Sequence, residues 1–234
     1  MSIILALDTS TDACSVALNQ NGEITSSFEI AAQSHTQRLL PMVDEILADA
    51  KLKLSQLDAI AFGRGPGSFT GLRICAGIVQ GLAFGANIPV IPISTLRAMA
   101  LQYFREHASF DGVVLSSLDA RMGEVYWGLY QRDAQALCVT INDEQVAKPV
   151  DVVAKATHKN IVGVGSGWNY PELAELNPLN IETTVQPRAE EIVLLAAVEL
   201  NQGRVVDALG AQPVYLRDSV SWQKRKRIRD NSID

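Results

Sequence analysis

The stretch IILALDTSTDACSVALNQNGEITSSFEI, residues 3–30, determines the fold class. Its first six residues are almost all apolar and show little alternation of apolar and polar side chains, which predicts a buried strand. Two further apolar-rich runs follow at residues 14–18 and 24–30, with Asn21-Gly22 between them. This dipeptide favours the tight turn of a β-hairpin. The chain is therefore expected to open with three adjacent strands, of which the last two form a hairpin.

A helix and then an alternation of strands and helices follow this opening. Residues 34–50 carry apolar side chains at helical spacing, and Ser34 stands three residues before Gln37, as in a capping box. Strands are expected at 57–62 and 87–91, and helices at 71–84 and 94–107. From residue 113 the order starts again, with strands at 113–119 and 124–130, strand-like residues at 136–147, a strand at 161–164, a helix at 189–201 and a strand at 213–216.

This element order predicts an α/β protein whose two lobes are duplicated. It resembles the actin-like (ribonuclease H-like) architecture, in which mixed sheets are flanked by helices. The expected domains are an N-terminal lobe at residues 1–108, a C-terminal lobe at 109–217, and a basic, mobile tail at 218–234. No residue-level repeat links the halves, so the duplication rests on element order alone, and a doubly wound sheet with a mixed edge is the alternative.

Composition and charge restrict the class of protein. The 234 residues are 47% hydrophobic and 20% charged, which is ordinary for a globular protein. The net charge is −6, but from Arg217 onward six Lys or Arg stand against three Asp, so the rest of the chain carries −9. An acidic body binds nucleic acid poorly by itself. The three dispersed cysteines predict reduced, buried thiols, and the absence of a signal or spanning pattern predicts a cytoplasmic protein without membrane contact.

Two turns after predicted strands could meet a nucleotide. Asp8, Thr9 and Ser10 follow the first strand, where hydroxyls and a carboxylate suit phosphate and hydrated magnesium. The matching turn of the second half holds Asp119 and Arg121, but no glycine follows the Asp until residue 123, which argues against a close phosphate contact. The other weak candidate is the glycine turn at Gly165. The alternative for each is a polar structural turn, and for Arg121 a salt bridge to Glu124 or Asp119.

The segment GRGPGSFTGLR, residues 63–73, is the sharpest local signal. Its glycine spacing fits neither a dinucleotide-binding fingerprint nor a P-loop. It predicts a strand–turn–helix junction capped by Ser68 or Thr70, and either an anion site or a purely structural turn. No metal-ligand or nucleophile pattern accompanies it, so we expect no catalytic residue, no metal and no intrinsic cofactor.

The helix after this loop has glycines four residues apart and is apolar nearly all round, so it should be covered on two sides. One side can face the sheet. The other needs either the helix at 34–50 or a partner molecule, and the two helices could also present a joint apolar face. The expected partner interface comprises Leu39, Leu40, Met42, Val43, Ile46, Leu47, Ile74, Gly77, Ile78, Gly81, Phe84 and Gly85.

Four segments together resemble the TsaB (YeaZ) family of the actin-like ATPase superfamily. They are LALDTST (5–11), SHTQRLLP (34–41), GPGSFTGLR (65–73) and DARMGEVY (119–126). The resemblance implies a required but non-catalytic partner of TsaD, which transfers a threonylcarbamoyl group to the tRNA adenine beside the anticodon. It also implies a complex with TsaE, a small ATPase that uses ATP, homodimers of the chain when alone, and tRNA contact mainly through the complex, aided by the basic tail.

The resemblance also explains why no metal is expected. TsaD proteins bind metal through a His-x-x-x-His pair, and here that spacing falls on Ser94 and Ala98, or on Thr95 and Met99. Neither pair can hold a metal in that way. The alternative function is a nucleotide-binding actin-like ATPase, or a peptidase-like enzyme, in its own right.

Overall fold

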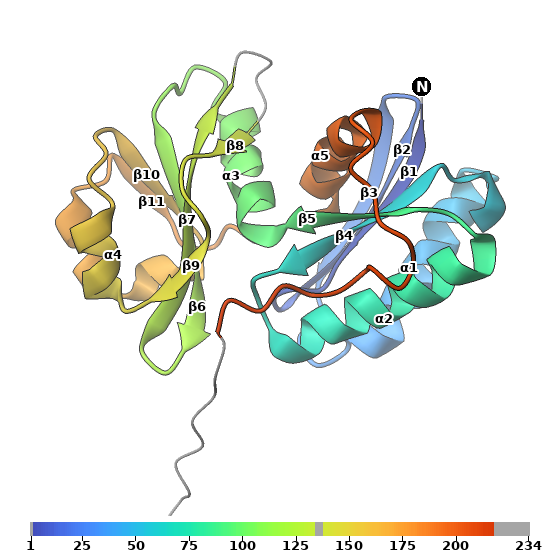
Figure 1. The fold of residues 1–234 in the computed structure, drawn as a ribbon, viewed down its shortest axis with the longest axis horizontal. Helices are drawn as coiled ribbons and strands as arrows, with labels where there is room; N and C mark the ends of the chain where they lie inside the picture. Colours follow the sequence, from blue (N-terminus) through green and yellow to red (C-terminus); the bar gives the residue numbers. More distant parts are fainter. Residues whose placement is uncertain (1, 134–137, 218–234) are drawn as a thin grey trace, which may run out of the picture.

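A computed structural model describes residues 2–133 and 138–217 and contains two mixed sheets (Figure 1). The first sheet has the strand order β3-β2-β1-β4-β5. β1 pairs with β2 and β2 with β3 in antiparallel fashion, whereas β4 and β5 run parallel to β1. The strands are β1 (Ile3–Asp8), β2 (Ala13–Gln20), β3 (Glu23–Ile30), β4 (Ala59–Gly65) and β5 (Val90–Ser94).

The second sheet repeats this order, as β11-β10-β6-β7-β8 with β9 also on β7. β6 and β7 form the antiparallel hairpin, and β10 and β11 run parallel to β6. The predicted duplication is therefore confirmed, and the single doubly wound sheet is wrong. The strands are β6 (Val113–Arg121), β7 (Glu124–Arg132), β8 (Cys138–Thr140), β9 (Gln145–Ala147), β10 (Ile161–Val164) and β11 (Asn180–Glu182).

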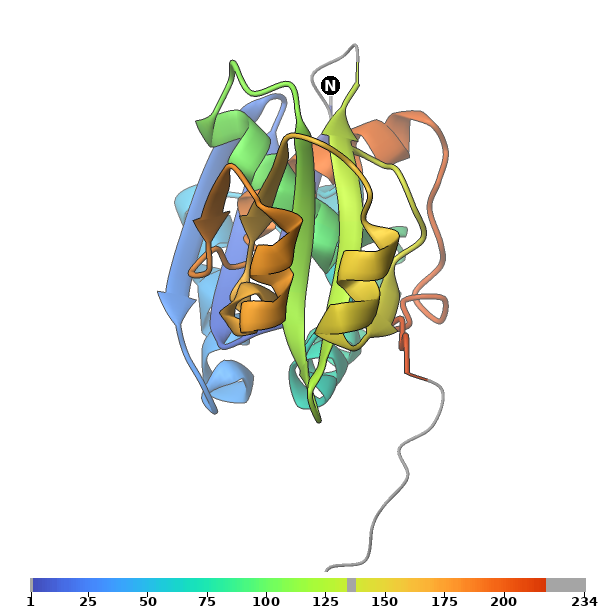
Figure 2. The same cartoon turned by 90° about the vertical axis from the view of Figure 1, so that its left-hand side faces the viewer.

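The helices form three layers around the two sheets. α1 (His35–Asp49) and α2 (Phe69–Ala86) cover the outer face of the first sheet, and α4 (Pro149–Lys155) covers the outer face of the second (Figure 2). α3 (Thr95–Glu106) and α5 (Ala189–Asn201) lie between the sheets (Figure 1). Three short 3₁₀ helices, η1 (Leu54–Gln56), η2 (Ser166–Asn169) and η3 (Pro171–Leu176), complete the order.

The two helices of the central layer cross between the lobes. α3 follows the first sheet in sequence but packs mainly on β6, β7 and β8 of the second, whereas α5 follows the second sheet and packs on β1 and β2 of the first. Ser15 in β2 accepts a hydrogen bond from the N–H of Ala189 at the start of α5, at 2.9 Å. The strands of the two sheets fall within the predicted ranges 1–108 and 109–217, and the two central helices pack across that boundary.

Most predicted elements are confirmed, and the differences have local causes. Asn21 and Gly22 adopt positive φ angles of 58° and 104°, as the hairpin prediction requires. The capping box at Ser34 is wrong, because its side chain makes no capping hydrogen bond. The strand predicted at 213–216 is also wrong. These residues belong to an extended segment, 204–217, that runs beside α2 (Figure 1). The tail at 218–234 lies outside the described residues.

The three cysteines are buried and unbridged, as predicted. Burial raises the pKa of the Cys14 and Cys138 thiols to about 12, and that of Cys75 is raised as well. Thiols with such pKa values are almost entirely protonated near neutral pH and react slowly as nucleophiles. They serve as small apolar side chains of the core.

Candidate functional site

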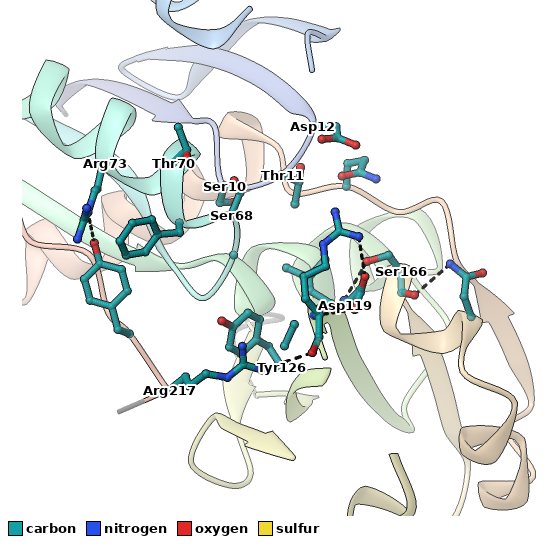
Figure 3. A pocket seen from close by; sticks show the side chains of 18 of the residues that line it. Ser10, Thr11, Asp12, Ser68, Thr70, Arg73, Asp119, Tyr126, Ser166 and Arg217 are labelled. Atoms are coloured by element: carbon teal, nitrogen blue, oxygen red, sulfur yellow. Dashed lines mark hydrogen bonds and ion pairs between the residues drawn. The ribbon is translucent and has the colours of Figure 1, made fainter. Parts of the chain in front are cut away.

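A cleft of about 1190 Å³ lies between the lobes (Figure 3). It is formed by the turn after β1, the N-terminal turn of α2, the end of β6, η2 and the extended segment. Its lining consists of Ser10, Thr11, Asp12, Gly67, Ser68, Phe69, Thr70, Arg73, Leu118, Asp119, Ala120, Arg121, Tyr126, Ser166, Asn169, Tyr170, Gln186, Tyr215 and Arg217.

Asp8 does not line this cleft, contrary to the sequence prediction. The residue is completely buried, and its Oδ1 accepts hydrogen bonds from the Ser10 N–H at 3.0 Å and from the Ser10 hydroxyl at 2.9 Å. Its Oδ2 has no hydrogen-bond partner among the described residues. Burial raises the pKa of this carboxyl to about 7. Asp8 is thus sealed beneath the turn and is not placed to hold hydrated magnesium in the cleft.

Thr9 is also buried, and its hydroxyl donates to the carbonyl of Gly71 at 2.8 Å. Of the three residues predicted in this turn, only Ser10 lines the cleft. The reason is the tight contact between the turn and the glycine loop. A Cβ at Gly67 would lie 2.3 Å from the Ser10 carbonyl oxygen, and one at Gly71 would lie 1.9 Å from that of Thr9. Close approach of two backbones therefore explains these glycines.

Gly63, near the end of β4, also faces a neighbour at close range. A Cβ at Gly63 would lie 1.8 Å from Oδ2 of Asp8, so only glycine leaves room for the buried carboxyl. Ser68 caps α2, as one of the two predicted candidates, by accepting a hydrogen bond from the Gly71 N–H at 3.3 Å. The close approach of the backbones and the Ser68 cap therefore give residues 63–73 a structural role, which was one of the two alternatives open from the sequence.

The second-lobe turn lines the cleft with Asp119 and Arg121. Asp119 accepts hydrogen bonds from the Arg121 N–H at 2.8 Å and from the Tyr170 hydroxyl at 3.1 Å. Arg121 forms the expected salt bridge to Asp119 at 3.1 Å, although its side chain is 86% exposed. Glu124 pairs with Arg217 instead.

Gly165 does not line the cleft either. Its φ is +96°, and a Cβ there would lie 2.4 Å from the carbonyl oxygen of Ser117 and 2.3 Å from the methyl of Met99. The residue is needed where β10 turns sharply into η2 against its neighbour β6. Its role in this structure is that of a tight turn, the alternative already open from the sequence.

Three side chains that the sequence did not single out meet at the mouth of the cleft. The Arg73 guanidinium lies 3.7 Å from the ring centroid of Phe69, and its Nε donates to the Tyr215 hydroxyl at 3.0 Å (Figure 3). The rings of Phe69 and Tyr215 are 5.7 Å apart. Phe69 and Arg73 are four residues apart on α2, which a helical pattern reveals. Tyr215 is 142 residues from Arg73 in sequence, and no sequence pattern links them.

The structure corrects five of the predicted partner contacts. The apolar side of α1 faces its own sheet, because this helix has one apolar stripe that must be removed from water. The buried residues are Leu39, Met42, Val43, Ile46 and Leu47, all at most 8% exposed and part of the core between α1, α2 and the first sheet. These side chains are therefore not available to a partner on this surface.

The other seven predicted contacts form the open face of α2 with one residue of α1: Leu40, Ile74, Gly77, Ile78, Gly81, Phe84 and Gly85. Leu40 is 42% exposed and Phe84 is 77% exposed. A Cβ at any of the three glycines would meet no atom within 4 Å. Thus α1 does not pack on the glycine stripe, and within the described residues nothing covers it.

Within residues 2–133 and 138–217, no group of three His, Cys, Asp or Glu side chains could share a metal ion. One described helix, α2, is long and apolar enough to cross a membrane by composition, with a mean hydropathy of 1.3 over 18 residues. Core helices of globular proteins can be equally long and apolar, so this composition is only weak support for a membrane-spanning helix.

Comparison with known proteins identifies the family. Residues 27–222 match the family model described as TsaD, tRNA N6-adenosine threonylcarbamoyltransferase. The chain is 46% identical to the tRNA threonylcarbamoyladenosine biosynthesis protein TsaB of Haemophilus influenzae, over 94% of this chain and 96% of that protein. It is 43% identical to TsaB of Escherichia coli, over 94% and 97%. The solved structure of YeaZ from Pseudomonas aeruginosa is 44% identical, with a TM-score of 0.86 over 92% and 100%. The chain therefore belongs to the TsaB (YeaZ) family of tRNA threonylcarbamoyladenosine biosynthesis proteins.

Proposed function

We propose that this chain is a non-catalytic subunit in the synthesis of threonylcarbamoyladenosine on tRNA, and that it acts by pairing with TsaD. The open face of α2 is the observation that carries the proposal. It combines exposed apolar side chains with three glycines at which an added Cβ would meet no atom of the described residues within 4 Å. Exposed apolar patches of this kind mark interaction sites, and interior helix glycines permit another backbone to come close.

The cost of the glycines supports a partner. Each glycine inside a helix destabilises it by about 1 kcal/mol relative to alanine. Within the described residues, no packing contact uses the space that Gly77, Gly81 and Gly85 leave open. A helix of a partner protein packed along this stripe would use it. A membrane would not, because lipid chains gain nothing from missing side chains.

The turns of the cleft support the non-catalytic role. An enzyme of the actin-like type needs a solvent-facing carboxylate and a close backbone at the phosphates, whereas Asp8 is sealed beneath Ser10. In the second lobe, Arg121 neutralises Asp119 and occupies the place where glycine would be needed.

The assembly around the chain forms part of the same proposal. TsaD carries the transferase activity, TsaE joins the complex and uses ATP, and the complex holds most of the tRNA contact. The chain alone forms homodimers through the open face of α2, since an uncovered apolar face can pair with its own copy. The complex works in the cytoplasm, where the tRNA that it modifies is found.

A modification assay tests the proposal. Purified TsaD and TsaE would be incubated with tRNA, threonine, bicarbonate and ATP, and with the enzyme that makes the threonylcarbamoyl adenylate. Mass spectrometry would measure the modified nucleoside with and without this chain. We expect modification only when the chain is present. Equal modification in its absence would contradict the proposed function.

The size of the cleft favours one alternative, a nucleotide-binding enzyme. A volume of about 1190 Å³ is large enough for a nucleotide. Calorimetry of the isolated chain with ATP and Mg²⁺ distinguishes the two candidates. Saturable binding that Asp119→Ala abolishes would favour the alternative, whereas no heat of binding is expected for the non-catalytic subunit.

A further inference from the structure

Glu144, in the loop before β9, places a carboxylate between the two lobes. Its side chain is only 9% exposed. Its Oε1 accepts hydrogen bonds from the hydroxyl of Ser94 in the first lobe and from that of Tyr130 in the second, the latter at 2.6 Å. The other oxygen, Oε2, lies 4.0 Å from the guanidinium of Arg64 in β4. One carboxylate therefore contacts side chains of both lobes.

Ser94 lies where the chain crosses from one lobe to the other (Figure 1). It is the last residue of β5, and α3, which begins at Thr95, packs mainly on β6, β7 and β8. Hinge motions are absorbed by a few residues at the ends of secondary-structure elements. A rotation of the lobes would therefore have to change the backbone at this crossing, and a contact that fixes Ser94 to the second lobe restricts it.

The second-lobe side of this contact is firmly held. Tyr130 in β7 is completely buried, and burial raises the pKa of its hydroxyl well above the usual value, so the group stays a donor near neutral pH. A Cβ at residue 128 would lie 2.8 Å from this hydroxyl, so Gly128 leaves room for the ring. The loop that carries Glu144 is tied to β7, because the Asn142 side chain accepts a hydrogen bond from the Leu129 N–H at 2.7 Å.

A second, more exposed contact also joins the lobes. The extended segment is bonded to β4 through the Val214 N–H and the Arg64 carbonyl, and its Arg217 pairs with Glu124 of β7. The side chains of this ion pair are 18% and 31% exposed, and partly exposed pairs contribute little because water screens them. Glu144 is less exposed, and hydrogen bonds to a carboxylate are stronger than those between neutral groups. We therefore expect Glu144 to restrict the lobes more than Arg217 does.

We propose that Glu144 is a latch that holds the two lobes at one fixed opening of the cleft. The carboxylate holds the hinge residue Ser94 from the second lobe, and Arg64 of the first lobe stabilises its negative charge. Proteins that close two lobes around a ligand need a mobile hinge. A latched chain instead keeps one width of the cleft in the absence of any ligand. This inference goes beyond the proposed function, because it concerns the lobes of the isolated chain.

Double electron–electron resonance between two spin labels on the full chain measures the opening of the cleft. The labels are attached to Asp12→Cys and Asn169→Cys, two exposed positions that line the cleft from opposite lobes. The three native thiols are buried and have raised pKa values, so they react slowly with the label. We expect one narrow distribution of distances when the latch is intact.

Ser94→Ala removes the hydrogen bond between the lobes and should shift this distribution to longer distances and broaden it. Ser94 also caps α3, by accepting a hydrogen bond from the Arg97 N–H at 3.1 Å. Ser68→Ala is therefore the matched control, because it removes the equivalent cap of α2 and has no contact with Glu144. It should leave the distribution unchanged.

Glu144→Ala should shift the distribution further than Ser94→Ala, because it removes the whole carboxylate. Glu144→Gln keeps an oxygen that can accept from both hydroxyls, so its shift should be smaller than that of Glu144→Ala. A second pair of labels, at Asp12→Cys and Asp49→Cys within the first lobe, should give the same distances in every variant. Should Glu144→Ala fail to fold, Ser94→Ala against Ser68→Ala decides.

Unchanged distances between the lobes in Ser94→Ala would overturn the proposal, and so would an equal shift in Ser68→Ala. A change between the two labels of the first lobe would show loosening within that lobe, which also contradicts a latch between lobes. A broad distribution in the chain with Ser94 and Glu144 intact would mean that the lobes move freely in spite of this contact. The modification assay above is separate, so the proposed function can stand if the latch fails.

Discussion

α1 and α2 lie side by side on the same face of the first sheet. The core of the protein accounts for the apolar side of α1, but it accounts for only one of the two apolar sides of α2. The exposed side of α1 carries charged residues such as Asp44, Glu45 and Asp49. The exposed side of α2 carries Phe84 and three glycines. Both helices bury an apolar stripe against the strands, but α2 has a second apolar side that residues 2–133 and 138–217 leave uncovered.

This difference separates residues that hold the protein together from residues that are free to contact another molecule. A buried residue of α1 or α2 should affect stability, and its replacement should affect pairing only through unfolding. An exposed residue of the open face should affect pairing alone. The predictions that follow test this separation, starting with the largest expected effect.

Val43→Asp should destabilise the isolated chain by about 3–5 kcal/mol, because it places a carboxylate where the side chain is 1% exposed. Urea unfolding followed by circular dichroism measures this change. The control is Asp44→Asn on the exposed side of the same helix, expected within about 0.5 kcal/mol of wild type. If the Val43→Asp chain is stable but fails to pair, Val43 contacts the partner directly, as the sequence analysis predicted.

Gly77→Leu should weaken pairing with TsaD at least tenfold, because the new side chain fills the space reserved for the partner. The monomer should keep its stability or gain about 0.5–1 kcal/mol, since leucine favours the helix. Surface plasmon resonance and urea unfolding measure the two effects. Ala174→Leu introduces the same side chain on the exposed side of η3 and should pair normally. Full affinity of Gly77→Leu would exclude the open face as the interface.

Asp8→Asn should change how stability depends on pH. The folded pKa of about 7 lies above the ordinary value of 3.8, so between these pH values the folded chain holds a proton that the unfolded chain has released. The free energy of unfolding therefore falls as pH rises from about 4 to 7, and it is flat above. The slope contributed by one proton is about 1.4 kcal/mol per pH unit.

Urea titrations at pH 5, 6, 7 and 8 would measure this slope, and Asp8→Asn should lower its magnitude. Glu191 on α5 is also buried with a pKa raised to about 7, so it contributes in the same direction. Glu191→Gln serves as the parallel variant, and the two substitutions together should remove more slope than either alone. An unchanged slope in Asp8→Asn would mean that this carboxyl is ionised in the folded chain at pH 6.

The N-terminal ends of the two helices give the smallest predicted effect. Ser68→Ala should destabilise the chain by about 1 kcal/mol, because its hydroxyl caps α2. Ser34→Ala should change stability by no more than a few tenths of a kcal/mol, because Ser34 makes no capping hydrogen bond at α1. Thermal unfolding of the two variants in parallel checks the comparison. Equal losses would mean that Ser34 caps α1 in solution.

Local pattern was a reliable guide where neighbouring residues set the conformation. The Asn21-Gly22 hairpin and the helix at Ala189–Asn201 were predicted at their observed places. The packing of that helix on the first sheet was not predicted. An apolar side shows that a helix is buried, but it does not show which sheet the helix packs against. The segment at 213–216 has strand-like residues but forms no regular strand. Its backbone contact is one hydrogen bond from the Val214 N–H to the Arg64 carbonyl in β4, and Tyr215 contacts Arg73 of α2.

The candidate site was predicted in part for a similar reason. Ser10 follows the end of β1, and Asp119 and Arg121 lie in the last three residues of β6; all three line the cleft, whereas their contact with a nucleotide stays a prediction. Asp8 also lies at a strand end, yet Ser10 and the glycine loop seal it. The contact between Arg73 and Tyr215 was missed, since Tyr215 reaches Arg73 from a segment far along the chain.

The sequence by itself determined the order of strands and helices, the repeated opening of the two halves and the membership of a family. These properties follow from periodicity, turn residues and motifs, which act over short distances along the chain. The tertiary structure alone decided that α1 hides its apolar side while α2 exposes part of its own, and that one carboxyl is sealed while another faces the cleft. Burial and charge pairing depend on segments brought together by folding, and those contacts are not encoded in any local stretch.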